Sequence, residues 1–94
     1  MNTRFADVTD AKRTIRNRII ELANRRRINA RDLKDSDVIP ETGVLDSAGI
    51  MELVIWFETT FDVTIEQSDL TLENFGTIDA MASYLQRSDA SPHD

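Results

Sequence analysis

Ser47 is the residue whose type and position most clearly allow chemistry, because it lies where a loop passes into an apolar-periodic segment. A serine hydroxyl becomes a nucleophile when a nearby base, usually a histidine, removes its proton. The single histidine, His93, lies in a small polar stretch, where we expect it to serve neither as a base nor as a ligand. Ser47 is therefore better suited to receiving a group from another enzyme than to performing catalysis itself.

The other residue types that could carry chemistry are sparse. The chain has no cysteine, which excludes disulfides and thiolate metal sites. Asp35 and Asp37 lie in a loop without partner groups, which favours solvated turn residues. The three glycines, Gly43, Gly49 and Gly76, are too far apart to form a phosphate-binding loop. The sequence thus predicts no catalytic residue, no metal site and no enzyme activity of its own.

Three segments carry the apolar periodicity of amphipathic helices and must position Ser47. We expect them to span residues 9–26, 47–61 and 77–86. Their predicted core faces are Val8, Ala11, Ile15, Ile19 and Leu22; then Ile50, Leu53, Val54, Phe57 and Phe61; and then Ile78, Met81, Ala82 and Leu85. Asp46 and Ser47 can supply oxygens for the free amides of the second helix, and Thr77 can cap the third.

A long connection, residues 28–46, separates the first two helices. It contains turn residues but also apolar ones, Ile28, Leu33, Val38, Ile39, Val44 and Leu45. A solvated linker would not need these, so we expect a structured loop that packs on the helices. Residues 66–70 could form a short turn of helix. The predicted fold is all-α: a small four-helix bundle of three main helices and one short helix, with one domain over 1–87 and a disordered tail over 88–94.

Charge is divided unevenly along the chain. Residues 1–31 hold nine basic and three acidic residues, whereas residues 32–94 hold two basic and 14 acidic residues. The acidic part should repel nucleic acid, and the run Arg25-Arg26-Arg27 lacks the interleaved aromatics of a nucleic-acid site. We interpret this run as a solvated helix end. With no long apolar stretch, we expect no membrane span and no cleaved leader, and a cytoplasmic monomer.

Several phrases in the sequence resemble those of acyl carrier proteins and the related peptidyl and aminoacyl carriers. They occur in the expected order and spacing over roughly residues 8–87. The phrases are Asp46-Ser47 followed by 49–54, then 57–65, then 72–78. An isolated Asp-Ser pair carries no information, but this pair at a loop–helix junction with the downstream phrases in place is specific.

The resemblance implies a four-helix bundle with 4′-phosphopantetheine on Ser47. It implies that a phosphopantetheinyl transferase takes the group from coenzyme A with magnesium, aided by Asp46. Cargo would be held as a thioester, which supplies the thiol that the sequence lacks. The surface of the second helix would dock partner enzymes. The candidate docking residues on it are Ala48, Met51, Glu52, Ile55 and Trp56.

The sequence also departs from the common carrier pattern. Ala48 stands where a large apolar residue is frequent, the second helix is not densely acidic, and the first helix is basic. These departures favour a stand-alone carrier loaded by an adenylating ligase, with an acyl or an aminoacyl cargo left open. Trp56 either is exposed as a docking anchor or packs on the long loop or the third helix. The alternative function is an unmodified, carrier-like structural or regulatory interaction module.

Overall fold

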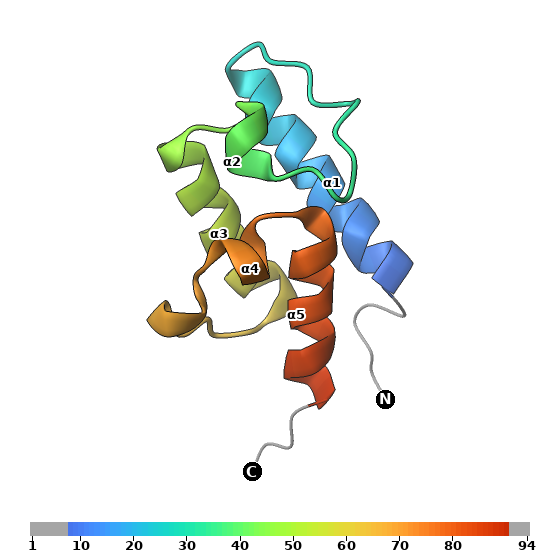
Figure 1. The fold of residues 1–94 in the computed structure, drawn as a ribbon, viewed down its shortest axis with the longest axis vertical. Coiled ribbons are helices and arrows are strands. Elements are labelled where there is room, and N and C mark those ends of the chain that lie inside the picture. Colours follow the sequence, from blue (N-terminus) through green and yellow to red (C-terminus); the bar gives the residue numbers. More distant parts are fainter. Residues whose placement is uncertain (1–7, 91–94) are drawn as a thin grey trace.

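The computed structural model describes residues 8–90 and shows a small helical bundle (Figure 1). The three main helices are α1 (Val8–Arg25), α3 (Ser47–Phe61) and α5 (Ile78–Ala90). Three short elements connect them: α2 (Ile39–Thr42), the 3₁₀ turn η1 (Gln67–Asp69) and α4 (Leu72–Phe75). The described part of the chain contains no strand, so the predicted all-α class is confirmed.

The predicted apolar faces form the core where α1 packs on both α3 and α5. Burial is nearly complete at the centre, where Ile15, Ile19, Phe57 and Ile78 have no exposed surface. Ile50 is only partly buried, at the rim of the core. The amphipathic stripes therefore predicted which side of each main helix faces inward.

An aromatic cluster joins α3 to the segment that follows it. The ring of Phe57 lies 4.9 Å from that of Phe61, 5.4 Å from Phe75 and 6.5 Å from Tyr84. Phe75 belongs to α4, which the sequence reading missed because four residues show no periodicity. Gly76 follows directly, and a Cβ there would lie only 2.5 Å from a backbone oxygen of α4, so this tight turn requires glycine.

The long loop after α1 is fastened to the bundle, as predicted. Its buried side chains are Ala30, Leu33, Ile39, Val44 and Leu45. Arg16 of α1 donates to the Leu33 carbonyl and pairs with Asp35. The Ile39 amide donates to the Gly76 carbonyl over 2.8 Å, which ties α2 to the turn before α5. The loop therefore leads to Ser47 along a fixed path.

Several boundaries differ from the expectation, and α1 is Val8–Arg25 where 9–26 was predicted. The helix predicted to end at residue 86 continues to Ala90. Residues 91–94, most of the predicted tail, lie outside the described residues, and so does His93. The predicted short helix at 66–70 is the 3₁₀ turn η1, and the predicted cap is confirmed, because Thr77 Oγ1 accepts the Ala80 amide over 2.9 Å.

Candidate functional site

The candidate site is the first turn of α3. Asp46 is the N-cap, in extended conformation, and its Oδ1 accepts the Gly49 amide over 2.8 Å. Ser47 is the first helical residue and is exposed. Its hydroxyl makes no hydrogen bond to any residue between 8 and 90. The expectation that both residues cap the helix is thus corrected, because Asp46 supplies the cap and leaves the Ser47 hydroxyl available.

Gly49 lets the cap close tightly. A Cβ at this position would lie 3.3 Å from Asp46 Oδ1 and 3.3 Å from two side-chain atoms of Leu45. The space beside Gly49 is therefore taken by the capping carboxylate and by Leu45. Leu45 is buried, with 3% of its surface exposed, and it anchors the chain directly before the exposed pair Asp46-Ser47. The serine is presented from a fixed position.

The end of α1 reaches the site through two ion pairs that the sequence did not predict. Arg25 Nη1 lies 3.1 Å from Glu52 Oε1, and Arg26 Nε lies 3.7 Å from Asp46 Oδ2. The four side chains are about half exposed, so each pair contributes at most about 1 kcal/mol to stability. Their importance is positional, because they place basic groups beside the first turn of α3.

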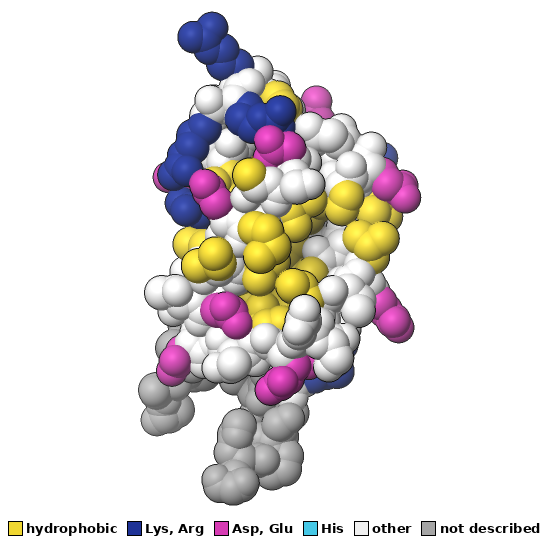
Figure 2. Space-filling model, turned by 90° about the vertical axis from the view of Figure 1, so that its left-hand side faces the viewer, with side chains coloured by type: hydrophobic (Ala, Val, Ile, Leu, Met, Phe, Trp, Pro, Cys, Tyr) yellow, Lys and Arg dark blue, Asp and Glu magenta, His cyan; other side chains and the backbone are white. Residues whose placement is uncertain are grey.

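Apolar side chains are exposed on the same side of the molecule. Met51 and Ile55 lie one turn apart on α3 with 48% and 57% of their surface exposed. Leu70 and Leu72, at the end of η1 and the start of α4, are also exposed. Figure 2 shows apolar side chains gathered over the middle of this face, with basic and acidic groups interleaved at one end. Exposed patches of this kind mark surfaces that meet a partner.

Trp56 has a different position from Met51 and Ile55. Its ring is partly buried, stands edge-on to Phe61 with centroids 5.7 Å apart, and lies 5.9 Å below the guanidinium of Arg18 on α1. The ring thus packs against α1, a contact that neither expected alternative named. The docking role of Trp56 stays a prediction.

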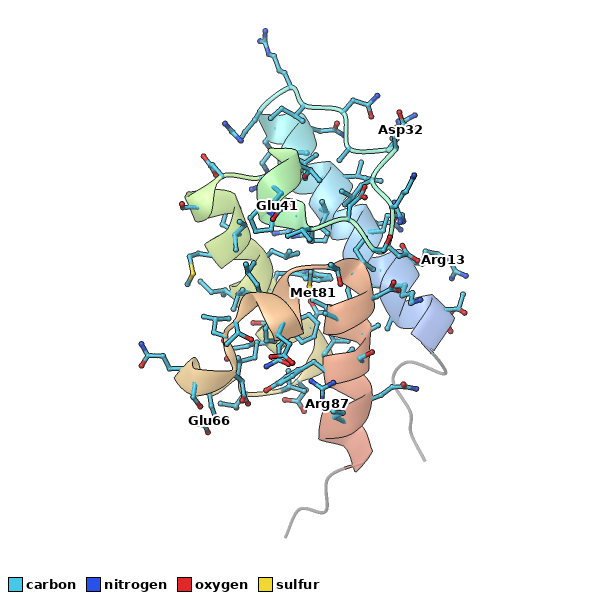
Figure 3. The ribbon with its side chains drawn as sticks, viewed as in Figure 1. Arg13, Asp32, Glu41, Glu66, Met81 and Arg87 are labelled. Carbon is cyan, nitrogen blue, oxygen red and sulfur yellow. The ribbon has the colours of Figure 1, made fainter. Side chains whose placement is uncertain are left out.

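The described residues hold no converging catalytic set. No group of three or more His, Cys, Asp or Glu within residues 8–90 could hold a metal ion. Asp35 pairs with Lys12 and Arg16 of α1, and Asp37 Oδ2 accepts the Lys34 amide over 2.9 Å. Figure 3 shows Glu66 at the lower left of the bundle, away from Arg13 and Asp32 on the right-hand side. No helix in this part of the chain is long and apolar enough to cross a membrane.

A small helical bundle that presents an unpartnered serine at a capped helix start, with exposed apolar residues along the same helix, is an arrangement suited to a carrier. The chain belongs to the family described as "Phosphopantetheine attachment site", which matches residues 13–85. It is therefore a phosphopantetheine-dependent carrier protein, and the expected class and covalent cofactor are confirmed. Proteins of this family are not themselves catalytic.

Curated relatives are carriers as well. The chain is 34% identical to the D-alanyl carrier protein of Streptococcus suis (strain 05ZYH33) over 74 residues, 79% of this chain and 89% of the relative. It is also 34% identical to Aminoacyl carrier protein 1 of Bradyrhizobium diazoefficiens over 71 residues, 71% and 77% of the two chains. No solved structure was found to match the chain.

The residues present fit a phosphopantetheine group. Ser47 is exposed, and a covalent bond to its hydroxyl would cost no hydrogen bond with the described residues. It stands at the N-terminus of the 15-residue helix α3, where the helix dipole and free amides favour an anion such as a phosphodiester. Arg26 adds a positive charge close by, through its contact with Asp46.

Proposed function

We propose that Ser47 is the residue that carries phosphopantetheine, and that the chain transports aminoacyl groups as thioesters after loading by an adenylating ligase. The observation that carries the first part is the exposed, unpartnered hydroxyl at the Asp46-capped start of α3, inside the matched region. The relatives named D-alanyl and aminoacyl carriers support the second part. A carrier of this kind acts as a monomer beside its ligase in the cytoplasm.

The chain's own residues have simple tasks in this function. Asp46 holds the first turn closed, so the Ser47 hydroxyl stays directed to solvent, where a transferase can reach it. The helix dipole stabilises the attached phosphate by about 0.3–1 kcal/mol. The bound group supplies a thiol that forms the thioester, which this cysteine-free chain cannot provide itself.

The docking surface for ligase and transferase surrounds Ser47 on α3. Ala48 is exposed and small, which leaves the first turn accessible, while Met51 and Ile55 offer an apolar contact further along the helix. Glu52 lies between these two and is held by Arg25. Trp56 supports this face from the side of α1.

Intact mass spectrometry tests the attachment. The purified chain is incubated with coenzyme A, magnesium and a broad-specificity phosphopantetheinyl transferase, and we expect one phosphopantetheine per chain. Ser47→Ala should gain no mass. Ser68→Ala removes another exposed serine, in η1, and should be modified like the wild type. If the wild type gains nothing, or Ser47→Ala is modified equally, the attachment proposal fails and the unmodified interaction module is favoured.

A second experiment tests the cargo. The modified protein is offered, with ATP, to a panel of purified adenylating ligases that activate D-alanine, other amino acids or fatty acids. We expect an aminoacyl mass that hydroxylamine removes, since hydroxylamine cleaves thioesters. Loading with fatty acyl groups only would contradict the aminoacyl proposal while leaving the attachment at Ser47 intact.

A further inference from the structure

The basic end of α1 is the feature that the carrier function leaves unexplained. We call Arg25, Arg26 and Arg27 the arginine cluster; all three side chains are exposed. It lies beside the attachment turn, because Arg25 pairs with Glu52 and Arg26 with Asp46. The chain after residue 31 is strongly acidic. The arginine cluster is therefore the region that places positive charge next to the candidate site.

Arg27 occupies a backbone position that normally favours glycine. The Ile28 amide donates to the Ala23 carbonyl over 3.0 Å, and the Arg27 amide donates to the Asn24 carbonyl over 2.9 Å. These two hydrogen bonds are the pair that defines a Schellman motif at a helix C-terminus. Arg27 occupies the position of this motif that has left-handed backbone conformation, with φ of 62°. A side chain is less favourable than glycine in this conformation. Helix termination alone therefore does not account for arginine at this position.

The arginine cluster keeps most of its hydrogen-bonding capacity. A guanidinium has five N–H donors, and Arg25 and Arg26 each direct a single nitrogen at a carboxylate of the site. Arg27 makes no ion pair or side-chain hydrogen bond with any residue in the described range. The pairs also offset the negative charge of Asp46, directly before Ser47, and of Glu52, further along α3. Arg27 adds to the cluster a positive charge that pairs with no carboxylate in the described range.

We propose that the arginine cluster, together with Met51 and Ile55, is a docking surface for a loading enzyme whose contact surface is acidic. This rests on the carrier function proposed above and names the chemistry of the partner. Carboxylates of such a partner would meet the free donors of the arginine cluster, while its apolar residues would cover the exposed part of α3. A basic partner would instead meet unpaired Arg27 and carboxylates that are already paired, so charge complementarity selects the acidic surface.

The main test compares two single variants. Each removes one exposed arginine, either within α1 or in the turn that follows it. Arg27→Gln removes the unpaired charge of the arginine cluster, and Arg13→Gln removes a charge at the other end of α1, where Arg13 pairs with Asp10. The probe is the adenylating ligase that loads the modified protein fastest in the panel above. We expect Arg27→Gln to raise KM about fivefold with kcat unchanged, and the effect to fade at high salt. Arg13→Gln should leave KM unchanged.

A second measurement needs neither the ligase nor the attached group. Relaxation of amide signals by an anionic and by a cationic nitroxide reports the local surface potential of the unmodified chain. We expect the anionic nitroxide to be enriched around Ser47 relative to Asp62 at the other end of α3, and the enrichment to fall in Arg27→Gln. Because intact mass reports attachment separately, a failure of the carrier function is distinguishable from a failure of this proposal.

Three results would overturn the proposal. The first is enrichment of the cationic nitroxide around Ser47. The second is unchanged loading of Arg27→Gln, or an effect equal to that of Arg13→Gln. The third is unchanged loading together with binding of a DNA duplex or of anionic phosphatidylglycerol vesicles that Arg27→Gln abolishes, which would assign the arginine cluster to nucleic acid or membrane instead.

Discussion

Two substitutions at Asp46 separate the structural role of this residue from its role in modification. Asp46→Ala removes the oxygen that accepts the Gly49 amide over 2.8 Å and also the ion pair with Arg26. Asp46→Asn keeps a capping oxygen and removes only the charge, because asparagine and aspartate are equally good N-caps. The two variants therefore differ in the cap but share the loss of the carboxylate.

The size of the effect follows from these contacts. Loss of an N-cap costs about 1 kcal/mol, and the half-exposed pair at 3.7 Å adds a few tenths. Asp46→Ala should thus lose about 1–1.5 kcal/mol of unfolding free energy, which lowers Tm by about 4–8 °C per kcal/mol in a domain of this size. Asp46→Asn should lose only about 0.3 kcal/mol.

The assay combines urea unfolding with the rate of phosphopantetheine transfer. Both Asp46 variants should be modified more slowly if the carboxylate assists the transferase. Thr77→Ala is the matched control, because it removes the cap of α5 at a similar cost in stability but far along the chain from Ser47. Equal destabilisation by Asp46→Ala and Asp46→Asn would refute the capping argument, and slow modification of Thr77→Ala would show that the transfer rate simply follows stability.

The remaining predictions concern the core, the ion pair between Lys12 of α1 and Asp79 of α5, and the docking face. Phe57→Ala should cost about 3–5 kcal/mol, measured by denaturant unfolding, because the buried ring packs on three other rings. The hydrogen bond from Lys12 to Asp79 raises the pKa of Lys12 above its usual 10.5, so this contact stabilises the fold below that pH and is lost as pH rises through the raised value. Asp79→Asn should lower the pKa of Lys12, which a titration of its side-chain carbon signals by NMR will show. Ile55→Ser, at a side chain with 57% exposure, should change stability by less than about 0.5 kcal/mol but slow ligase loading, and unimpaired loading would remove Ile55 from the docking face.

Most of the fold could be predicted because its determinants are local. The bounds of α3 match the expected 47–61, since its capping residue and apolar stripe are both present in consecutive sequence. The short helices α2 and α4 escaped prediction, because four residues form only one turn and carry no periodicity. A signal for α4 did exist, as Thr71 caps it by accepting the Asn74 amide.

Ser47 as the attachment residue stays a prediction, and the contacts around it were not predicted. The sequence singled out Ser47, and the family match to residues 13–85 agrees with the expected class of carrier. It did not show that Asp46 alone caps the helix, because both side chains carry a suitable oxygen. Nor did it decide between exposure and packing of Trp56, which depends on how closely α1 lies against α3.

The sequence by itself thus determined the three amphipathic helices, the attached loop and the serine at a helix start, since these depend on residues a few positions apart. Tertiary structure alone decided which charges meet, because Arg25 and Glu52 are 27 positions apart and come together only when α1 packs on α3. That packing places a basic helix end beside Ser47 in a chain whose net charge is −6.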